Sequence, residues 1–277
     1  MDILTQGILG AATAVASSSR IFGIRPAIIY GFTLGIIPDI DILLSKFIHH
    51  HWLIHRGVTH SIFFAPCIAY LAYFFRWFYK KGFERQWFWL VFWSLLTHPI
   101  LDFFTSSGTP LLMPLSYHQF ALSSIAVIDL NYSMPLFIAL TICWFLKSVS
   151  KAMYINAFAI FITTTYLLLG IIYQEKAVSI IDNEMKSQNF LNNLKCMVGA
   201  DLFSIKNRYA LCFNENIIYK TYFSLNFNQD LKTPPSIIWE IKENTADLSN
   251  KRKINKYIIE KKLKTILSYC TQRFKID

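Results

Sequence analysis

The chain has 277 residues, of which 54% are hydrophobic and only 16% are charged, well below the quarter of charged residues that a soluble domain carries. The imbalance is uneven, because residues 1–173 hold ten Lys/Arg and six Asp/Glu whereas residues 174–277 hold seventeen and eleven. This composition excludes a uniformly soluble protein. It predicts a membrane-embedded domain, residues 1–173, and a basic soluble tail domain, residues 174–277, of unassigned role.

The net charge of +10 has two possible physical explanations. Excess Lys/Arg attracts nucleic acid in soluble proteins, but in a membrane protein it sets orientation and contacts anionic headgroups. We therefore expect membrane lipids as partners and no nucleic acid.

Six apolar segments follow one another in the first domain. Four of them approach the ~20 residues that a spanning helix needs, and the first two are shorter. Glycines at 7, 10, 31 and 35 favour close packing of these two as a helical hairpin. The expected fold is an all-α polytopic membrane domain of about six apolar helices, two of them short. The segments are 3–17, 26–38, 58–79, 87–104, 125–146 and 152–173.

Basic residues mark alternate connections between these segments. The loops at 18–25, 76–86 and 147–151 are rich in Lys/Arg, and the intervening loops are poor in them. The positive-inside rule places the basic loops in the cytoplasm. The opposite segment ends and both termini are then expected outside, on the periplasmic side of a bacterial inner membrane.

The tail has the pattern of a small α+β domain. Alternating aromatic stretches at 209–213, 219–227 and 236–241 predict strands, and residues 251–270 predict a basic amphipathic helix. None of the five cysteines forms a CxxC pair, so a zinc ribbon or a redox motif is not indicated. The tail cysteines leave a disulfide open, and they are Cys196, Cys212 and Cys270.

Acidic residues are scarce in residues 1–173, and five of the six lie at segment ends on the predicted outer side. An Asp at mid-bilayer costs about 2.5–3.5 kcal/mol on insertion scales, so such residues persist where a function or a partner offsets the cost. The five are Asp2, Asp39, Asp41, Asp102 and Asp129.

Histidines gather at the same ends. His98 and Asp102 are four residues apart, which places imidazole and carboxylate on one helix face. His55 and His60 lie in the stretch HRGVTHS just before the third segment, and PDID at 38–41 ends the second. Imidazole and carboxylate from three segment ends can therefore meet at one cation.

Each pair alone has an ordinary structural explanation, since a DxD often caps a helix and a His four residues from an Asp often lies on a solvated face. Their coincidence at one level of the membrane favours a metal site. We assign catalysis to Asp39, His60 and Asp102. The expected metal ligands are Asp39, Asp41, His55, His60, His98 and Asp102.

Mixed nitrogen and oxygen ligands favour Zn²⁺, Mn²⁺ or Fe²⁺ as the divalent metal ion. Such a cation lowers the pKa of bound water and acts as a Lewis acid on an ester or phosphoester oxygen. Arg56 has a planar fork suited to an anionic oxygen of a substrate. Its alternative is a salt bridge to Asp39 or Asp41, and the sequence leaves both open.

These residues also carry a family resemblance. The chain resembles the bacterial inner-membrane family described as metal-dependent hydrolases (the YbcI/YdjM type, also described as LexA-binding). The resemblance implies a multi-spanning α-helical fold and metal-dependent hydrolysis, with Asp2, Gln6 and Asp129 supporting the ligands. The matching stretches include MDILTQ at 1–6, PDID at 38–41, HRGVTHS at 55–61, LTHPILD at 96–102 and Asp129.

The first interpretation is a membrane-bound hydrolase in which metal-activated water attacks an ester or phosphoester, with a lipid-linked substrate expected at the bilayer interface. One alternative is a non-catalytic membrane protein with a structural metal site. Another is a membrane-associated binding partner of an intracellular regulator, which requires the tail to lie in the cytoplasm.

Overall fold

The structure is a computed structural model that describes residues 1–41, 56–79, 82, 84–187, 194–213, 217–225 and 240–244. The predicted ligand His55 and the predicted helix at 251–270 lie outside these residues. The chain forms two compact units. We call them the helical unit (Met1–Ala121 and Val127–Leu168) and the sheet unit (Leu122–Ala126 and Leu169–Asp277), and each is described by itself.

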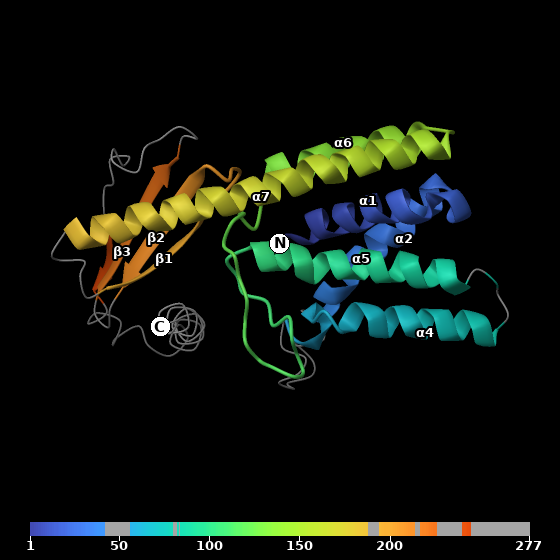
Figure 1. The fold of residues 1–277 in the computed structure, drawn as a ribbon, viewed down its shortest axis with the longest axis horizontal. Helices are drawn as coiled ribbons and strands as arrows, with labels where there is room; N and C mark the ends of the chain where they lie inside the picture. Colours follow the sequence, from blue (N-terminus) through green and yellow to red (C-terminus); the bar gives the residue numbers. More distant parts are fainter. Residues whose placement is uncertain are drawn as a thin grey trace. The chain divides into compact units, whose positions relative to one another are not determined.

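The described part of the chain is mostly helical (Figure 1). The six predicted apolar segments each overlap one α-helix. Two stretches, Arg85–Phe104 and Val149–Lys186, are long and apolar enough to cross a membrane, and α6 is apolar but shorter. Six membrane crossings therefore remain a prediction. The helices are α1 (Ile3–Phe22), α2 (Ile24–Ile36), α4 (Phe64–Phe78), α5 (Glu84–Phe104), α6 (Leu130–Phe145) and α7 (Val149–Ser187), with 3₁₀ turns η1 (Ile37–Ile40) and η3 (Val58–His60).

Several helix bounds differ from the apolar segments for local reasons. Helix α4 begins only at Phe64, because the preceding residues form η3 and a turn. Helix α6 begins at Leu130, because the Asp129 side chain accepts the Asn131 N–H and caps it there. Helix α7 continues well past residue 173, since Ile180 keeps a buried helical face.

Glycines bring α1 and α2 into close contact, as the hairpin prediction requires. A Cβ built on Gly10 would lie 2.5 Å from the Gly31 carbonyl oxygen. A Cβ on Gly35 would lie 2.6 Å from the Gln6 carbonyl oxygen. No side chain fits at these positions without a shift of backbone, so small residues set the spacing of the two helices.

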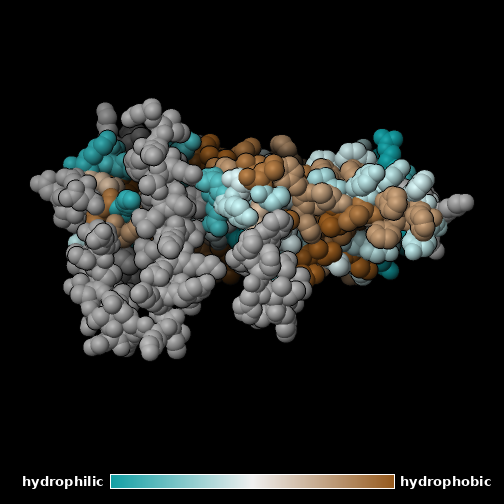
Figure 2. Space-filling view, turned by 90° about the horizontal axis from the view of Figure 1, so that it is seen from below, coloured by the Kyte–Doolittle hydropathy of each residue, from teal (hydrophilic) through white to brown (hydrophobic). Residues whose placement is uncertain are grey.

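The exterior of the helical unit is rich in apolar side chains, while small residues pack inside it. Ala65 and Ala69 of α4 are buried against Leu90 and Leu95 of α5. Large exposed side chains follow the outer faces of α4 and α6, among them Phe75, which is 57% exposed. Figure 2, seen from the side on which α4 lies, shows hydrophobic surface on the helical unit. A surface of this kind is suited to lipid.

The described residues of the sheet unit form four antiparallel strands in the order β1-β2-β3-β4. The predicted strands at 209–213 and 219–227 correspond to β2 and β3, and the stretch at 236–241 overlaps the start of β4. Strand β1 was not predicted. The strands are β1 (Lys195–Ala200), β2 (Asn207–Phe213), β3 (Ile217–Ser224) and β4 (Glu240–Asn244).

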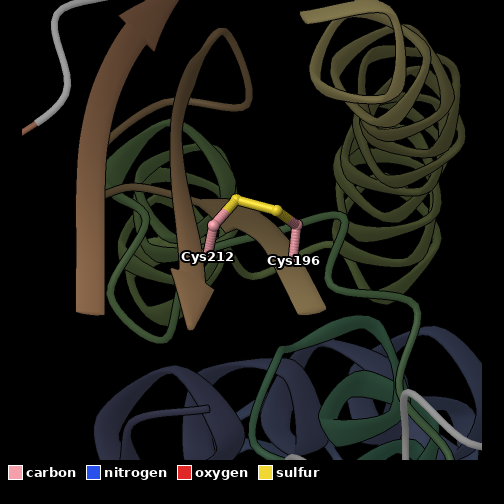
Figure 3. Close-up of a disulfide and its surroundings, with 2 residues drawn as sticks. All are labelled: Cys196 and Cys212. Atoms are coloured by element: carbon pink, nitrogen blue, oxygen red, sulfur yellow. A yellow bond between two sulfur atoms is a disulfide. The ribbon is translucent and has the colours of Figure 1, made fainter. Parts of the chain in front are cut away.

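A disulfide joins the first two strands. Cys196 and Cys212 are direct register partners in β1 and β2, and their sulfur atoms are bonded (Figure 3). Of the three tail cysteines, these two therefore form the pair that the sequence left open. The bond closes a loop of known register and so stabilises the hairpin by restricting the unfolded chain.

Arg208 of β2 holds the sheet unit together. Its side chain is fully buried. Its Nη1 donates to the Gln174 Oε1 at 2.8 Å, and its Nη2 donates to the carbonyl oxygens of Gly170 at 3.0 Å and Ser124 at 3.2 Å. These contacts link the middle of α7, the segment Leu122–Ala126 and the sheet within this unit.

Candidate metal centre

Three predicted ligands meet where helices of the helical unit end. Asp39 lies in η1 directly after α2, and His60 lies in η3 shortly before α4. His98 and Asp102 lie one turn apart near the end of α5. All four side chains are buried, so the imidazoles and carboxylates are removed from water.

The ligand atoms of Asp39, His60 and His98 form a compact triangle. The two Nε2 atoms of the histidines are 3.1 Å apart. Asp39 Oδ1 lies 3.3 Å from the His60 Nε2 and 3.4 Å from the His98 Nε2. Bonds of 2.0–2.1 Å in a tetrahedral zinc site separate neighbouring ligand atoms by about 3.3 Å. The spacing of the triangle therefore fits a small divalent cation.

The other ring nitrogens fix the orientation of both imidazoles. His98 Nδ1 donates to the Gly35 carbonyl oxygen at 2.7 Å, and that oxygen can only accept. His60 Nδ1 lies 3.3 Å from Asp41 Oδ2 and 3.0 Å from Thr59 Oγ1. With its proton on Nδ1, each neutral ring presents a lone pair on Nε2. The two lone pairs and the Asp39 carboxylate then face one another.

The electrostatic surroundings keep Asp39 ionised. Burial alone would raise the pKa of this carboxyl, but hydrogen bonds and charge from His60 and His98 outweigh it and hold the pKa below its ordinary value. For His60, burial lowers the pKa, and contacts with Asp39 and Asp41 outweigh this and raise it. A cation in the centre would replace the proton that His60 otherwise tends to hold.

Asp102 lies next to the triangle, and its carboxylate contacts several nitrogen atoms. Its Oδ2 lies 3.6 Å from the His60 Nε2 and 3.4 Å from the Arg56 Nη2. Its Oδ1 accepts from Gln6 Nε2 at 3.0 Å and from the Met1 α-amino group. The Gln6 Oε1 is buried and has no hydrogen-bond partner among the described residues.

The remaining predicted site residues occupy distinct places. Asp41 touches the outer nitrogen of His60, Thr59 Oγ1 at 2.7 Å and the Arg56 N–H at 3.1 Å. Arg56 pairs with Asp102, whereas one of the two alternatives left open by the sequence was a salt bridge to Asp39 or Asp41. Its main chain, not its side chain, contacts Asp41.

Asp2 and Asp129 serve helix starts. Asp2 Oδ1 accepts the Thr5 N–H and caps α1. Asp129 caps α6, and its Oδ2 accepts from the Tyr166 hydroxyl at 2.9 Å. These contacts stabilise the starts of α1 and α6.

Sequence reasoning missed two groups that orient the ligands. The Gly35 carbonyl carries no sequence signal, because every residue has a backbone oxygen. Thr59 had a signal, since it directly precedes His60 and its hydroxyl can bridge a carboxylate and an imidazole.

Basic and aromatic side chains contact one another at the other helix ends. Arg25, at the start of α2, donates to the Trp144 carbonyl oxygen at 3.3 Å near the end of α6. Arg76, near the end of α4, lies over the ring of Trp87 near the start of α5. Since helices alternate in direction, the metal centre lies at the start of α4 and the end of α5, away from these groups.

The fold and the centre together define a mostly helical membrane protein with a buried group of one carboxylate and two imidazoles that is able to hold a metal ion. The chain belongs to the YdjM inner membrane protein family, whose model matches residues 1–177. The resemblance seen in the sequence is thereby confirmed. The family's name, together with the apolar helices, establishes the membrane location.

One curated relative extends this comparison. The chain is 33% identical over 111 residues to "Inner membrane protein YbcI" of Escherichia coli (strain K12). The aligned part covers 38% of this chain and 62% of the relative's length. No solved structure matches the chain significantly.

Proposed function

We propose that this chain is a metal-dependent hydrolase of the bacterial inner membrane that acts on an ester or phosphoester. The observation that carries the proposal is the meeting of three possible ligand atoms, Asp39 Oδ1 and the Nε2 atoms of His60 and His98, within 3.1–3.4 Å. A divalent cation would take the place of the protons that otherwise lie between these atoms. A zinc, manganese or iron ion suits this mixture of imidazole and carboxylate.

Residues of the chain have two roles in the proposed site, as metal ligands and as groups that orient the ligands. Asp39, His60 and His98 hold the ion, and Asp102 stands beside them as a further carboxylate. Asp41 and the Gly35 carbonyl keep each imidazole turned toward the centre. Once bound, a divalent ion supplies Lewis acidity and lowers the pKa of water to near neutrality.

The centre is proposed to face the periplasm. Arg25 and Arg76 lie at helix ends away from it, and the positive-inside rule places such ends in the cytoplasm. The Cys196–Cys212 disulfide supports the same orientation independently, because disulfides persist in oxidising compartments. It follows α7 in the chain, so one crossing by α7 separates it from the basic residues Lys147 and Lys151.

A loop beside the centre supports a lipid or lipid-linked substrate. Leu111 accepts from the Ile62 N–H at 3.0 Å and from the Ser61 hydroxyl at 3.3 Å, directly after His60. The same loop exposes Leu115 at 80% and Tyr117 at 60%. Exposed apolar side chains at the level of a bilayer interface insert among lipids.

Metal analysis and a hydrolysis screen test the proposal together. Protein purified in mild detergent should retain a transition metal and hydrolyse members of an ester and phosphoester library. His60→Ala should lose both, whereas His118→Ala, which alters a loop histidine packed on Phe120, should keep both. Wild-type protein without bound metal would overturn the proposal. Metal without hydrolysis would favour a structural metal site.

A further inference from the structure

A basic side chain stands beside the candidate metal centre. The Arg56 guanidinium is only 13% exposed, and its Nη2 lies 3.4 Å from Asp102 Oδ2. That same oxygen lies 3.6 Å from the His60 Nε2. A single carboxylate oxygen therefore separates the guanidinium from a metal-ligating nitrogen.

The contacts of the Arg56 guanidinium with described residues involve only some of its N–H groups. Nη2 touches Asp102, and Nη1 donates instead to the Gly108 carbonyl oxygen at 3.1 Å. The Arg56–Asp102 ion pair is therefore not bidentate, since only one guanidinium nitrogen contacts the carboxylate. Arg has five N–H donors, and contacts within the described residues engage two of its nitrogens. Within the described part of the chain, donors remain for an anionic oxygen.

The backbone of Arg56 is held in an unusual conformation. Its φ is 64°, in the left-handed region that a non-glycine residue rarely adopts. The left-handed residue is thus Arg56 and not the neighbouring Gly57. The Asp41 Oδ2 accepts the Arg56 N–H at 3.1 Å and thereby stabilises this conformation. Because Asp41 also contacts His60, one carboxylate fixes both the guanidinium and a metal ligand. Strain of this kind is retained where it places a functional group.

We infer that Arg56 binds a non-bridging oxygen of a phosphoester substrate beside the metal ion, so that the enzyme is a phosphoesterase and not a carboxylesterase. This inference rests on the proposed metal-dependent hydrolysis. A carboxylic ester carries no charge in its ground state, so a largely buried guanidinium has little to bind there. A phosphoester carries an anionic oxygen that matches the fork of Arg.

The test compares wild type with Arg56→Gln and Arg56→Lys as full-length, detergent-purified protein. Metal content, binding of inorganic phosphate by calorimetry, and hydrolysis of bis(p-nitrophenyl) phosphate and p-nitrophenyl butyrate are measured for each. Arg20→Gln removes the same charge from the exposed last turn of α1 and is the matched control.

Wild type and Arg20→Gln should bind phosphate and cleave the phosphodiester in preference to the butyrate. Arg56→Gln should keep its metal, bind phosphate at least about tenfold more weakly and lose phosphodiester hydrolysis to a similar extent. Arg56→Lys should fall between, since it keeps the charge but not the fork. If Arg56→Gln loses metal through misfolding, Arg56→Lys provides the comparison.

The adverse outcomes are distinct. Metal-containing wild type that cleaves only the butyrate, or binds phosphate no better than the Arg56 variants, overturns the phosphoester inference and leaves a hydrolase. Wild type that holds no metal overturns the proposed function itself, and the inference with it.

Discussion

The carbonyl oxygen of Gly35 lies 2.7 Å from Nδ1 of His98, and this contact connects helix packing to the metal centre. Gly35 sits where α2 meets α1, so closely that a Cβ there would lie 2.6 Å from the Gln6 carbonyl oxygen. The side chain of Gln6 in turn donates to Asp102. The spacing of the first two helices thus positions an imidazole and a carboxylate at the same time.

Gly35→Ala should therefore damage both stability and the site. The methyl group forces α1 and α2 apart, and overpacking of this kind costs about 1–3 kcal/mol. The shift moves the carbonyl that orients His98, so we expect a lower unfolding temperature in detergent and reduced metal content. Ser17→Ala, on an exposed position of α1, is the control. Full metal content at the wild-type unfolding temperature would contradict the coupling.

Asp41 and Asp39 should respond differently to the same substitution. Asp39→Asn replaces an ionised ligand and should abolish binding at any practical concentration of metal. Asp41 contacts the outer nitrogen of His60, so Asp41→Asn should weaken affinity by roughly 10–100-fold while the same number of ions binds at saturation. Calorimetric titration of metal-stripped protein with the metal ion measures both the affinity and the number of bound ions.

The titration also decides between two assignments of Asp41. The sequence predicted it as a ligand, and the structure places it against Nδ1 of His60. Loss of a bound ion in Asp41→Asn, equal to the loss in Asp39→Asn, would support the ligand assignment. Retention of wild-type affinity would remove Asp41 from the site altogether.

Much of the site could be predicted from the sequence because the membrane environment makes polar residues costly. His98 and Asp102 are separated by one helical turn, so their shared face follows from helix geometry alone. That Asp39, His60 and His98 meet also follows from short segments that alternate in direction. The orienting contact from Gly35 could not be predicted, since a backbone oxygen leaves no pattern in the sequence.

The fold shows the same division. The apolar segments and the strands β2 and β3 were visible as periodic patterns, because lipid and a half-buried sheet select side chains at regular intervals. Strand β1 was missed, since KCMVGA has little alternation and its place depends on pairing with β2. The continuation of α7 past residue 173 was missed for a related reason. Its charged residues suggested a new domain, although Ile180 and Ile181 keep a buried face.

The orientation in the membrane should be visible in reporter fusions. Alkaline phosphatase fused after Asp277 should be active and a fluorescent protein at the same place dark, because the proposed topology puts the disulfide-containing tail in the periplasm. Fusions in the basic 76–86 loop should behave in the opposite way. A bright fluorescent fusion at the C-terminus would place the tail in the cytoplasm and would favour binding of an intracellular regulator.

The loop beside the centre should matter for lipid substrates and not for soluble ones. Leu115 is the most exposed large apolar residue of this loop, and inserting a leucine side chain into lipid is worth about 1.5–3 kcal/mol. Leu115→Asp should therefore lower hydrolysis of a phosphoester lipid in vesicles by roughly tenfold or more. Its rate on soluble bis(p-nitrophenyl) phosphate should stay at the wild-type level, because Leu115 is 80% exposed whereas Asp39, His60 and His98 are buried. Leu202→Asp, an equally drastic change at an exposed leucine of the sheet unit, is the control. Equal losses on both substrates would indicate damage to the centre, and no loss on vesicles would exclude this loop as the route by which lipid reaches the metal.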